Sequence, residues 1–212
     1  MIYDHHIIEE HFDNLTPKQL HQFQQLYAAY AEWNGRINVI SRKDFDALYL
    51  HHVLHSLAIA RVCQFNAGAR IADVGCGGGF PSVPLAILFP EANFTAIDSI
   101  RKKISVVEGV CKEVGIENIT AINARIESID QKFDYVVSRA VTNMKTFVDW
   151  VWGKIGRGQT GTLPNGILYL KGGDLTEELA ATAPIHWQRY PISNFFTHDF
   201  FETKEVVYTP KK

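Results

Sequence analysis

One stretch of this 212-residue chain, residues 71–80 with the sequence IADVGCGGGF, constrains the possible fold more than any other. Its apolar, β-branched start at residues 71–74 predicts a short strand, and the glycines that follow predict a sharp turn. Residues 81–88 then predict a helix, because Pro81 is tolerated in a first turn that does not use its missing N–H group. A strand, a glycine turn and a helix N-terminus together indicate a ligand site, since the backbone can approach a ligand closely there and offers free N–H groups.

The spacing of the glycines indicates which ligand this turn binds. A dinucleotide fingerprint has the form G-x-G-x-x-G, but Phe80 occupies the place of its third glycine. The glycines instead follow G-x-G-x-G, and Asp73 stands two residues before the first of them. This arrangement resembles motif I of the class I S-adenosylmethionine-dependent methyltransferases. An NAD site and a glycine turn that binds nothing remain as alternatives.

From residue 70 onward, predicted strands and helices alternate, which is typical of a parallel sheet with both faces covered. The predicted strands are 71–74, 93–97, 119–122, 133–137, 167–170, 187–190 and 201–208, and the predicted helices are 81–88, 104–114, 144–152 and 175–181. The alternation predicts the α/β class, and the resemblance to motif I implies a class I, Rossmann-like methyltransferase with a mostly parallel seven-stranded sheet and helices on both faces. Ligands of such sheets bind beyond the carboxyl ends of the strands, so Val74, Asp98, Asn123 and Val137 should line one crevice.

A small helical extension is predicted at 1–66, before an S-adenosylmethionine-dependent methyltransferase domain at 67–212. Thr16 can cap a first helix that has Pro17 at its first position, and the apolar stripe of this helix ends near Gly35. A basic connector at 36–43 leads to a second predicted helix at 44–63.

The second helix carries three histidines that invite a metal interpretation. His51 and His55 are four residues apart on one face, with His52 beside them. The H-E-x-x-H pattern of zinc helices is missing and no carboxylate lies among them, so we expect no metal site. One of these histidines facing a substrate cleft is the alternative that we keep open.

Charge and cysteine content favour a cytoplasmic protein. The chain has 21 Lys and Arg against 23 Asp and Glu, which does not indicate a nucleic-acid partner by itself, and the basic run at 101–103 reads as a solvated helix face. No apolar run reaches the ~18 residues that cross a bilayer, and residues 1–10 are too polar for a secretory leader. The three cysteines are odd in number and lack C-x-x-C spacing, which is typical of a reducing compartment.

Two charged residues stand at predicted strand ends. Asp98 follows the glycine turn by about 20 residues, where nucleotide-binding folds place an acid on ribose hydroxyls. Capping the next helix is a compatible role for the same carboxylate. Arg139 should face the crevice and contact cofactor or RNA, because a guanidinium suits both carboxylate and phosphate. A structural salt bridge from Arg139 to Asp73 or Asp98 is the alternative.

The end of the fourth predicted strand constrains the methyl acceptor. Amino methylases carry an Asn/Asp-Pro-Pro-aromatic motif there, but this chain reads SRAV at 138–141, and none of its cysteines follows a proline as in cytosine-C5 enzymes. A ring nitrogen such as guanine N7 has a free lone pair in the ring plane and needs neither a base nor a nucleophile. The sequence is compatible with such an acceptor, for which a catalytic dyad is unnecessary.

Nearly the whole chain resembles the RsmG (GidB) family of bacterial small-subunit ribosomal RNA guanine-N7 methyltransferases. The matching stretches are WN at 33–34, INVIS at 37–41, HVLHS at 52–56, DVGCGGGFPSVPL at 73–85, DS at 98–99 with KK at 102–103, RIE at 125–127, VSRA at 137–140 and LKG at 170–172. They occur in the family's order, and the F-P-x-x-P-L end of motif I is specific to it.

This resemblance implies methyl transfer from S-adenosyl-L-methionine, with S-adenosyl-L-homocysteine as product, to N7 of a guanine in 16S ribosomal RNA by in-line displacement. It implies cofactor contacts, for which the candidates are Gly75, Gly77, Phe80, Asp98, Ile126, Glu127 and Arg139. Candidates for the RNA side of the cleft are Asn38, His52, Arg125 and Lys171. Arg139 would position the reactants, with no general base and no metal.

Two departures from the family pattern concern this site. Ser82 stands where the family usually has Gly, and His55 stands where it has Asp in H-x-x-D-S. The first can alter the helix start near the methionine end of the cofactor, and the second weakens any role of the N-terminal segment. We expect a monomer whose substrate is the small subunit or an assembly intermediate. A class I methyltransferase of small molecules or proteins, and a binding module without activity, are the competing interpretations.

Overall fold

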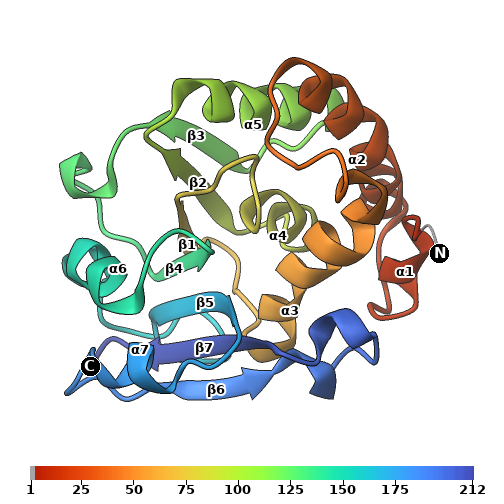
Figure 1. Cartoon of the computed structure of the whole chain (residues 1–212). Coiled ribbons are helices and arrows are strands. Elements are labelled where there is room, and N and C mark those ends of the chain that lie inside the picture. The colour runs from red at the N-terminus through yellow and green to blue at the C-terminus, as the bar shows by residue number, and fades with distance from the viewer. Residues whose placement is uncertain (1–2) are drawn as a thin grey trace.

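One seven-stranded sheet forms the centre of the computed structural model, which describes residues 3–212 (Figure 1). The strands are β1 (Arg70–Val74), β2 (Asn93–Asp98), β3 (Ile119–Asn123), β4 (Tyr135–Arg139), β5 (Gly166–Gly172), β6 (Gln188–Pro191) and β7 (Lys204–Pro210). Their order is β3-β2-β1-β4-β5-β7-β6. Strand β7 runs antiparallel to β5 and β6, while the other neighbouring pairs are parallel. The predicted α/β class with a mostly parallel sheet is confirmed.

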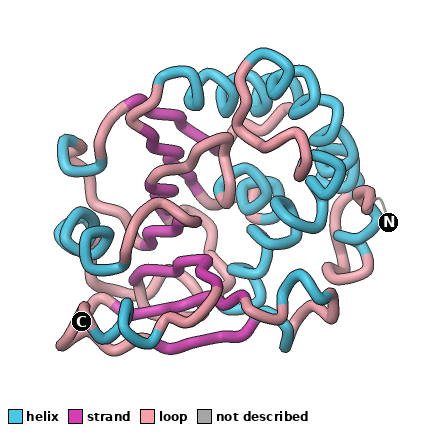
Figure 2. The backbone as a smooth tube through the Cα atoms, in the orientation of Figure 1, coloured by secondary structure: helices cyan, strands magenta, loops and turns pink. Residues whose placement is uncertain are grey.

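Helices cover both faces of this sheet (Figures 1 and 2). The helices are α1 (His6–Glu9), α2 (Pro17–Arg36), α3 (His55–Val62), α4 (Ser82–Leu88), α5 (Arg101–Val114), α6 (Met144–Val151) and α7 (Thr176–Ala180). Side chains of α1 to α5 share one hydrophobic cluster with one face of the strands, and those of α6 and α7 share a second cluster with the other face. Because successive strand residues point to opposite faces, Val136 belongs to the second cluster and its neighbour Val137 to the first.

The longest N-terminal helix, α2, begins where its capping residue predicts. The amide of Gln19 donates to the Thr16 hydroxyl at 3.3 Å, and the Thr16 amide donates back to the Gln19 side chain at 2.9 Å, which forms a capping box. The apolar face of α2 packs along α5, where the indole of Trp33 lies against the backbone of Gly109. The extension is thus part of the same hydrophobic core as the sheet, and its treatment as a separate unit at 1–66 stays a proposal.

Two strands begin later along the chain than predicted. Strand β4 begins at Tyr135 rather than Phe133, because the Phe133 amide bonds to the Lys154 carbonyl, outside the β1 pairing. Strand β7 begins at Lys204, since Phe201 instead turns into the core within a short 3₁₀ helix.

The helix predicted over 44–63 is divided into three kinds of helix. A 3₁₀ turn at Phe45–Ala47 is followed by a π-helical segment, Leu48–Leu54, and then by α3. The π-helical segment carries His51 and His52. Such segments are rare and frequently lie at functional sites. Among the described helices, none is both long enough and apolar enough to span a membrane.

Candidate active site

The glycine turn lies at the carboxyl end of β1, as predicted. The amides of Gly75 and Cys76 both donate to the carbonyl of Ile97 at the end of β2, at 2.8 and 3.1 Å, so the turn is anchored to the neighbouring strand. Gly75 has a φ of +71°, and a Cβ there would lie 2.4 Å from the Val141 side chain. A glycine is therefore required at this position by both backbone conformation and space.

A cavity of about 590 Å³ opens at this edge of the sheet. It is lined by the glycine turn, the end of β2, the loop after β3 and the end of β4. The sequence candidates that line it are Gly75, Gly77, Phe80, Asp98, Arg125, Ile126, Glu127 and Arg139. The structure therefore brings together all seven cofactor candidates and one of the four RNA candidates.

Asp98 holds the turn and the next helix together from inside this cavity. One carboxylate oxygen accepts from the Gly77 amide at 3.1 Å and lies 3.6 Å from the Lys103 ammonium. The other accepts from the Ile100 amide at 2.9 Å, just before α5 begins. The N-cap residue of α5 is Ile100 and receives no side-chain cap bond, so the predicted cap by Asp98 is not formed; Asp98 instead fixes the turn before the helix. Its contact with ribose stays a prediction.

Asp73 connects β1 to α4 behind the glycine turn. Its side chain is fully buried, and one of its oxygens accepts from the Ser82 amide at 2.9 Å. The other oxygen has no partner among the described residues, and neither does the Ser82 hydroxyl. Burial raises the pKa of the Asp73 carboxyl to about 7. Ser82, which departs from the family pattern, is therefore the residue whose amide bonds to Asp73 at the start of α4.

Arg139, at the end of β4, lines the cavity and is hydrogen-bonded to the π-helical segment. Its guanidinium donates to the His51 carbonyl at 3.1 Å and contacts Nδ1 of His52 at 2.9 Å. It also lies 5.2 Å from the ring centroid of Phe80. The alternative salt bridge is not formed within the described residues, because Asp73 bonds to Ser82 and Asp98 pairs with Lys103.

The N-terminal extension forms part of the cavity wall. The Tyr30 hydroxyl donates to the Gly78 carbonyl at 2.8 Å, and the Tyr30 ring stacks on Phe80 with centroids 4.8 Å apart. Val39 of the basic connector covers Gly78 so closely that a Cβ there would lie 2.8 Å from a Val39 methyl carbon. Tyr30 and Val39 were not predicted as site residues. Tyr30 lies on the apolar stripe of a helix and Val39 lies in a connector, and neither position indicates which distant element the side chain contacts.

The four RNA candidates occupy different surroundings. Asn38 and Arg125 are exposed. His52 has a side chain that is 13% exposed and bonded to Asp44. Lys171 is 11% exposed, pairs with Glu178 at 2.6 Å and donates to the Thr142 carbonyl at 3.0 Å. Asn38 and Arg125 can reach a ligand as they stand, whereas His52 and Lys171 are held by protein partners.

The third histidine, His55, is the first residue of α3 and does not line the cavity. His55 is buried and packs edge-on against the rings of Phe200 and Phe201, at 5.6 and 5.9 Å between centroids. Burial lowers the pKa of its imidazole well below the usual value. The departure at position 55 therefore lies in the aromatic core.

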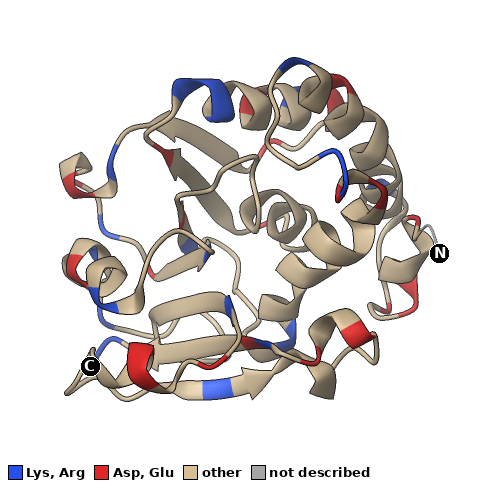
Figure 3. Cartoon of the chain, viewed as in Figure 1, with Lys and Arg blue, Asp and Glu red and all other residues tan. Residues whose placement is uncertain are grey.

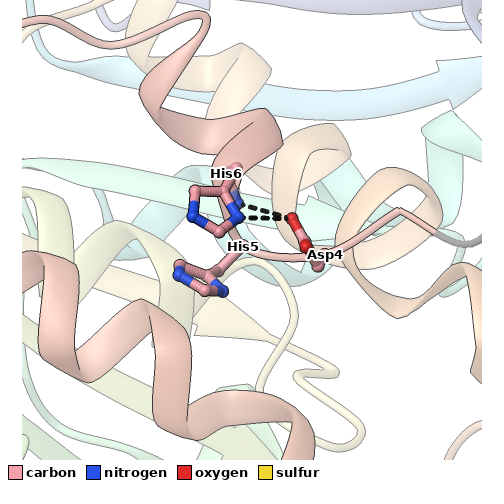
Figure 4. Close-up of side chains that lie close together, drawn as sticks. All are labelled: Asp4, His5 and His6. Atoms are coloured by element: carbon pink, nitrogen blue, oxygen red, sulfur yellow. Dashed lines mark hydrogen bonds and ion pairs between the residues drawn. The ribbon is translucent and has the colours of Figure 1, made fainter.

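Two other features lie outside this cavity. Asp4, His5 and His6 bring three ligand-type atoms within 4.8 Å of one another near the N-terminus, where Asp4 bonds to His6 (Figure 4). A second hollow of about 570 Å³ lies between α6 and β6 and is lined by Trp152 and Trp187. No carboxyl end of a parallel strand opens into it, so the cavity at the glycine turn is the better candidate.

The surface charge is mixed, as the composition predicts. Figure 3 shows basic and acidic residues interspersed over the elements of the fold. Within the cavity, the cations Lys103, Arg125 and Arg139 face the acids Asp98 and Glu127.

The residues of the cavity fit S-adenosylmethionine. A Cβ added to Gly77 would meet no atom within 4 Å, so the backbone of the turn is open to a ligand. Apolar Ile97 and Ile126 can flank a flat base, while Asp98 offers acceptors for hydroxyl groups. The fit rests on this combination of open backbone, apolar walls and acceptor groups.

Solved structures of methyltransferases share the fold. A structure of an S-adenosylmethionine-dependent methyltransferase from Aquifex aeolicus superposes with a TM-score of 0.56 at 12% identity, over 76% of this chain and 92% of that one. A precorrin-6y C5,15-methyltransferase from Geobacter metallireducens gives a TM-score of 0.52 at 14% identity, over 83% and 92% of the two chains. Fold and site together define a class I, S-adenosylmethionine-dependent methyltransferase.

Sequence comparison identifies the family. The family model described as "GidB: rRNA small subunit methyltransferase G" matches residues 19–199. Proteins named ribosomal RNA small subunit methyltransferase G are 55% identical in Flavobacterium psychrophilum, over 97% of both chains, and 47% identical in Bacteroides thetaiotaomicron, over 96% of this chain and 98% of that one. The chain belongs to the GidB family of ribosomal RNA small subunit methyltransferases, and the resemblance seen in the sequence is confirmed.

Proposed function

We propose that this protein transfers a methyl group from S-adenosylmethionine to N7 of one guanine in bacterial 16S ribosomal RNA. The observation that carries this proposal is the full-length similarity to ribosomal RNA small subunit methyltransferases G. The cavity at the glycine turn supports it, because that cavity gathers the residues at which the family resemblance implies cofactor contacts.

The chemistry asks little of the protein beyond alignment and control of charge. S-adenosylmethionine supplies a methyl group that is activated by a positively charged sulfur. Asp98, Ile126 and Glu127 would hold the nucleoside part of the cofactor, and the glycine turn would hold the part nearer its sulfur. Arg139 would position the reactants from the end of β4. Guanine N7 attacks with a lone pair in the ring plane, so no side chain has to remove a proton before transfer.

The RNA side of the cavity is proposed at Asn38 and Arg125, with His52 and Lys171 acting through the residues that they contact. The mixed surface charge favours a substrate that is recognised by shape, such as the small subunit or an assembly intermediate, over a free transcript bound by charge alone. We propose that the protein acts as a monomer in the bacterial cytoplasm, where such particles are assembled.

The test uses small subunits from cells that lack this protein. The purified chain and methyl-labelled S-adenosylmethionine are added, and the label is mapped by cleavage at N7-methylguanosine. We expect label at one guanine, with slower labelling of protein-free transcript. Cofactor binding without RNA label, together with labelled small molecules or protein, would overturn the proposal in favour of the rival methyltransferase interpretation.

A further inference from the structure

Asp44 forms the outer end of a polar chain that leads into the cavity. One of its carboxylate oxygens lies 2.5 Å from Nδ1 of His51, and the other lies 2.6 Å from Nε2 of His52. Both histidines belong to the π-helical segment, whereas Asp44 precedes it. A single carboxylate therefore holds two successive imidazoles in place.

The proton positions along this chain follow from its inner end. The Arg139 guanidinium can only donate, so Nδ1 of His52, at 2.9 Å from it, must accept and carry no proton. The proton of the neutral ring is then on Nε2, and Nε2 donates to Asp44. Burial and the charge of Arg139 lower the pKa of His52 to about 4, so the ring is neutral near pH 7.

This arrangement fixes the guanidinium from one side. One of its terminal nitrogens donates to the His51 carbonyl and the other to His52, so the two bonds set the plane of the group. Asp44 holds both residues that receive these bonds. The remaining N–H groups of Arg139 have no hydrogen-bond acceptor within the described part of the chain, and Arg139 is one of the residues that line the cavity.

We propose that Asp44 is a positioning residue for Arg139: through the Nε2–H tautomer of His52, it holds the guanidinium in its working orientation at the cavity. This inference rests on the proposed function, because methyl transfer is one of its two readouts. It assigns a reaction role to Asp44, which was not among the site residues predicted from the sequence.

The first test compares Asp44→Asn with the matched control Asp46→Asn, an exposed acid two residues away. We expect Asp44→Asn to lower kcat for labelling of small subunits by ~10-fold to ~100-fold, the scale of a misplaced positioning group. The affinity for S-adenosylmethionine should change less than about twofold, and Asp46→Asn should match the wild type. An Asp44→Asn enzyme with the wild-type kcat would overturn the inference.

A double-mutant cycle tests whether Asp44 acts through His52. The variants are Asp44→Asn, His52→Gln and their combination, and the combination should lose no more activity than His52→Gln alone. Losses that multiply would show independent roles and overturn the inference. If Asp44→Asn does not fold, Asp44→Glu takes its place, since it keeps the charge and displaces the carboxylate by one methylene.

The second readout does not depend on turnover. Nitrogen-15 NMR of the imidazoles should show His52 of the wild type with its proton on Nε2. In Asp44→Asn the ring is no longer held against Arg139, so a mixture of both tautomers is expected. A wild-type protein that shows this tautomer but labels no RNA would refute the proposed function and leave the arrangement intact. An active wild type with the proton on Nδ1 would refute the inference alone.

Discussion

Arg139 is a cation whose described hydrogen-bond partners are neutral groups. It is bonded to a backbone carbonyl and a neutral imidazole, and it lies over an aromatic ring. Burial lowers the pKa of its guanidinium to about 10, which still leaves the group charged at pH 7. A cation held in this way favours an anionic ligand, and phosphate or carboxylate would supply the missing charge.

We predict that Arg139→Ala lowers methyl transfer by on the order of 100-fold while the protein stays folded. Arg139→Lys should recover little of the activity, because an ammonium cannot reproduce the planar pair of bonds to His51 and His52. Initial rates and thermal unfolding curves measure the two effects. Lys112→Ala, which removes an exposed cation from α5, is the control. An unchanged rate in Arg139→Ala would contradict the role.

The raised pKa of Asp73 makes the free energy of unfolding depend on pH. Its pKa is about 7 in the folded protein and near 3.8 in the unfolded chain, so between these values the folded state binds the proton more tightly. Stability from this group is therefore greatest below pH 4 and is lost as the pH rises through 7, by up to about 4 kcal/mol.

Asp73→Asn should remove this dependence and stabilise the cofactor-free protein at pH 8, because the amide can donate to the free Ser82 hydroxyl. Urea unfolding of both proteins from pH 5 to pH 8 measures the difference. Parallel stability profiles over that range would show that Asp73 does not titrate there.

At the scale of elements, the sequence predicted what depends on local pattern. The cap at Thr16 and the glycine turn after β1 are local, and both were predicted where they occur. The start of β4 was predicted two residues too early, because Phe133 is apolar enough for a strand. In the structure Phe133 instead pairs with the distant Ile155, which the local sequence does not indicate. The π-helical segment was also missed, since its apolar spacing resembles that of an α-helix over so few residues.

The packing of α2 on α5 gives a prediction for this scale. A Cβ on Gly109 would lie 2.0 Å from the Trp33 indole, so Gly109→Ala should force the helices apart and cost ~1–3 kcal/mol of unfolding free energy. Gly35→Ala is the matched control, because it lies in α2 with no atom within 4 Å of the new methyl group. It should stabilise the protein by ~0.5–1 kcal/mol through helix propensity. The denaturant midpoints of the two variants are compared with that of the wild type. Equal shifts for Gly109→Ala and Gly35→Ala would refute the close contact between Trp33 and Gly109.

At the scale of the whole molecule, the site joins two parts that the sequence separates. Val74 and Asp98 line the cavity as predicted, because the carboxyl ends of parallel strands meet at one edge. Asn123 and Val137 do not line it: Val137 is buried in the core and the Asn123 amide bonds to the Asp98 carbonyl. The contribution of the N-terminal extension was not predictable: Val39 lines the cavity, while Tyr30 supports Gly78 and Asp44 supports His52 through packing of distant segments. Long-range contacts of this kind leave no periodic signal in the sequence.

This union predicts that residues 67–212 do not fold alone. Without the extension, the side of α4 and α5 that packs on α2 and α3 would be exposed to water. We expect the fragment to lack a cooperative unfolding transition and to bind no S-adenosylmethionine, as measured by calorimetry beside the full chain. A sharp transition with cofactor binding would instead establish the 67–212 segment as an independent domain.

The position of β7 has a consequence for the order in which the molecule can be built. Strand β7 is the last strand along the chain, yet it lies between β5 and β6 and forms the ladder that joins them. While the chain is being synthesised, β6 has no partner strand and β5 keeps one open edge until residues 204–210 emerge. An unpaired edge can recruit other chains. Until β7 is made, the open edges of β5 and β6 must therefore be kept from contact with other chains. A chain that ends just before residue 204 would be prone to aggregate.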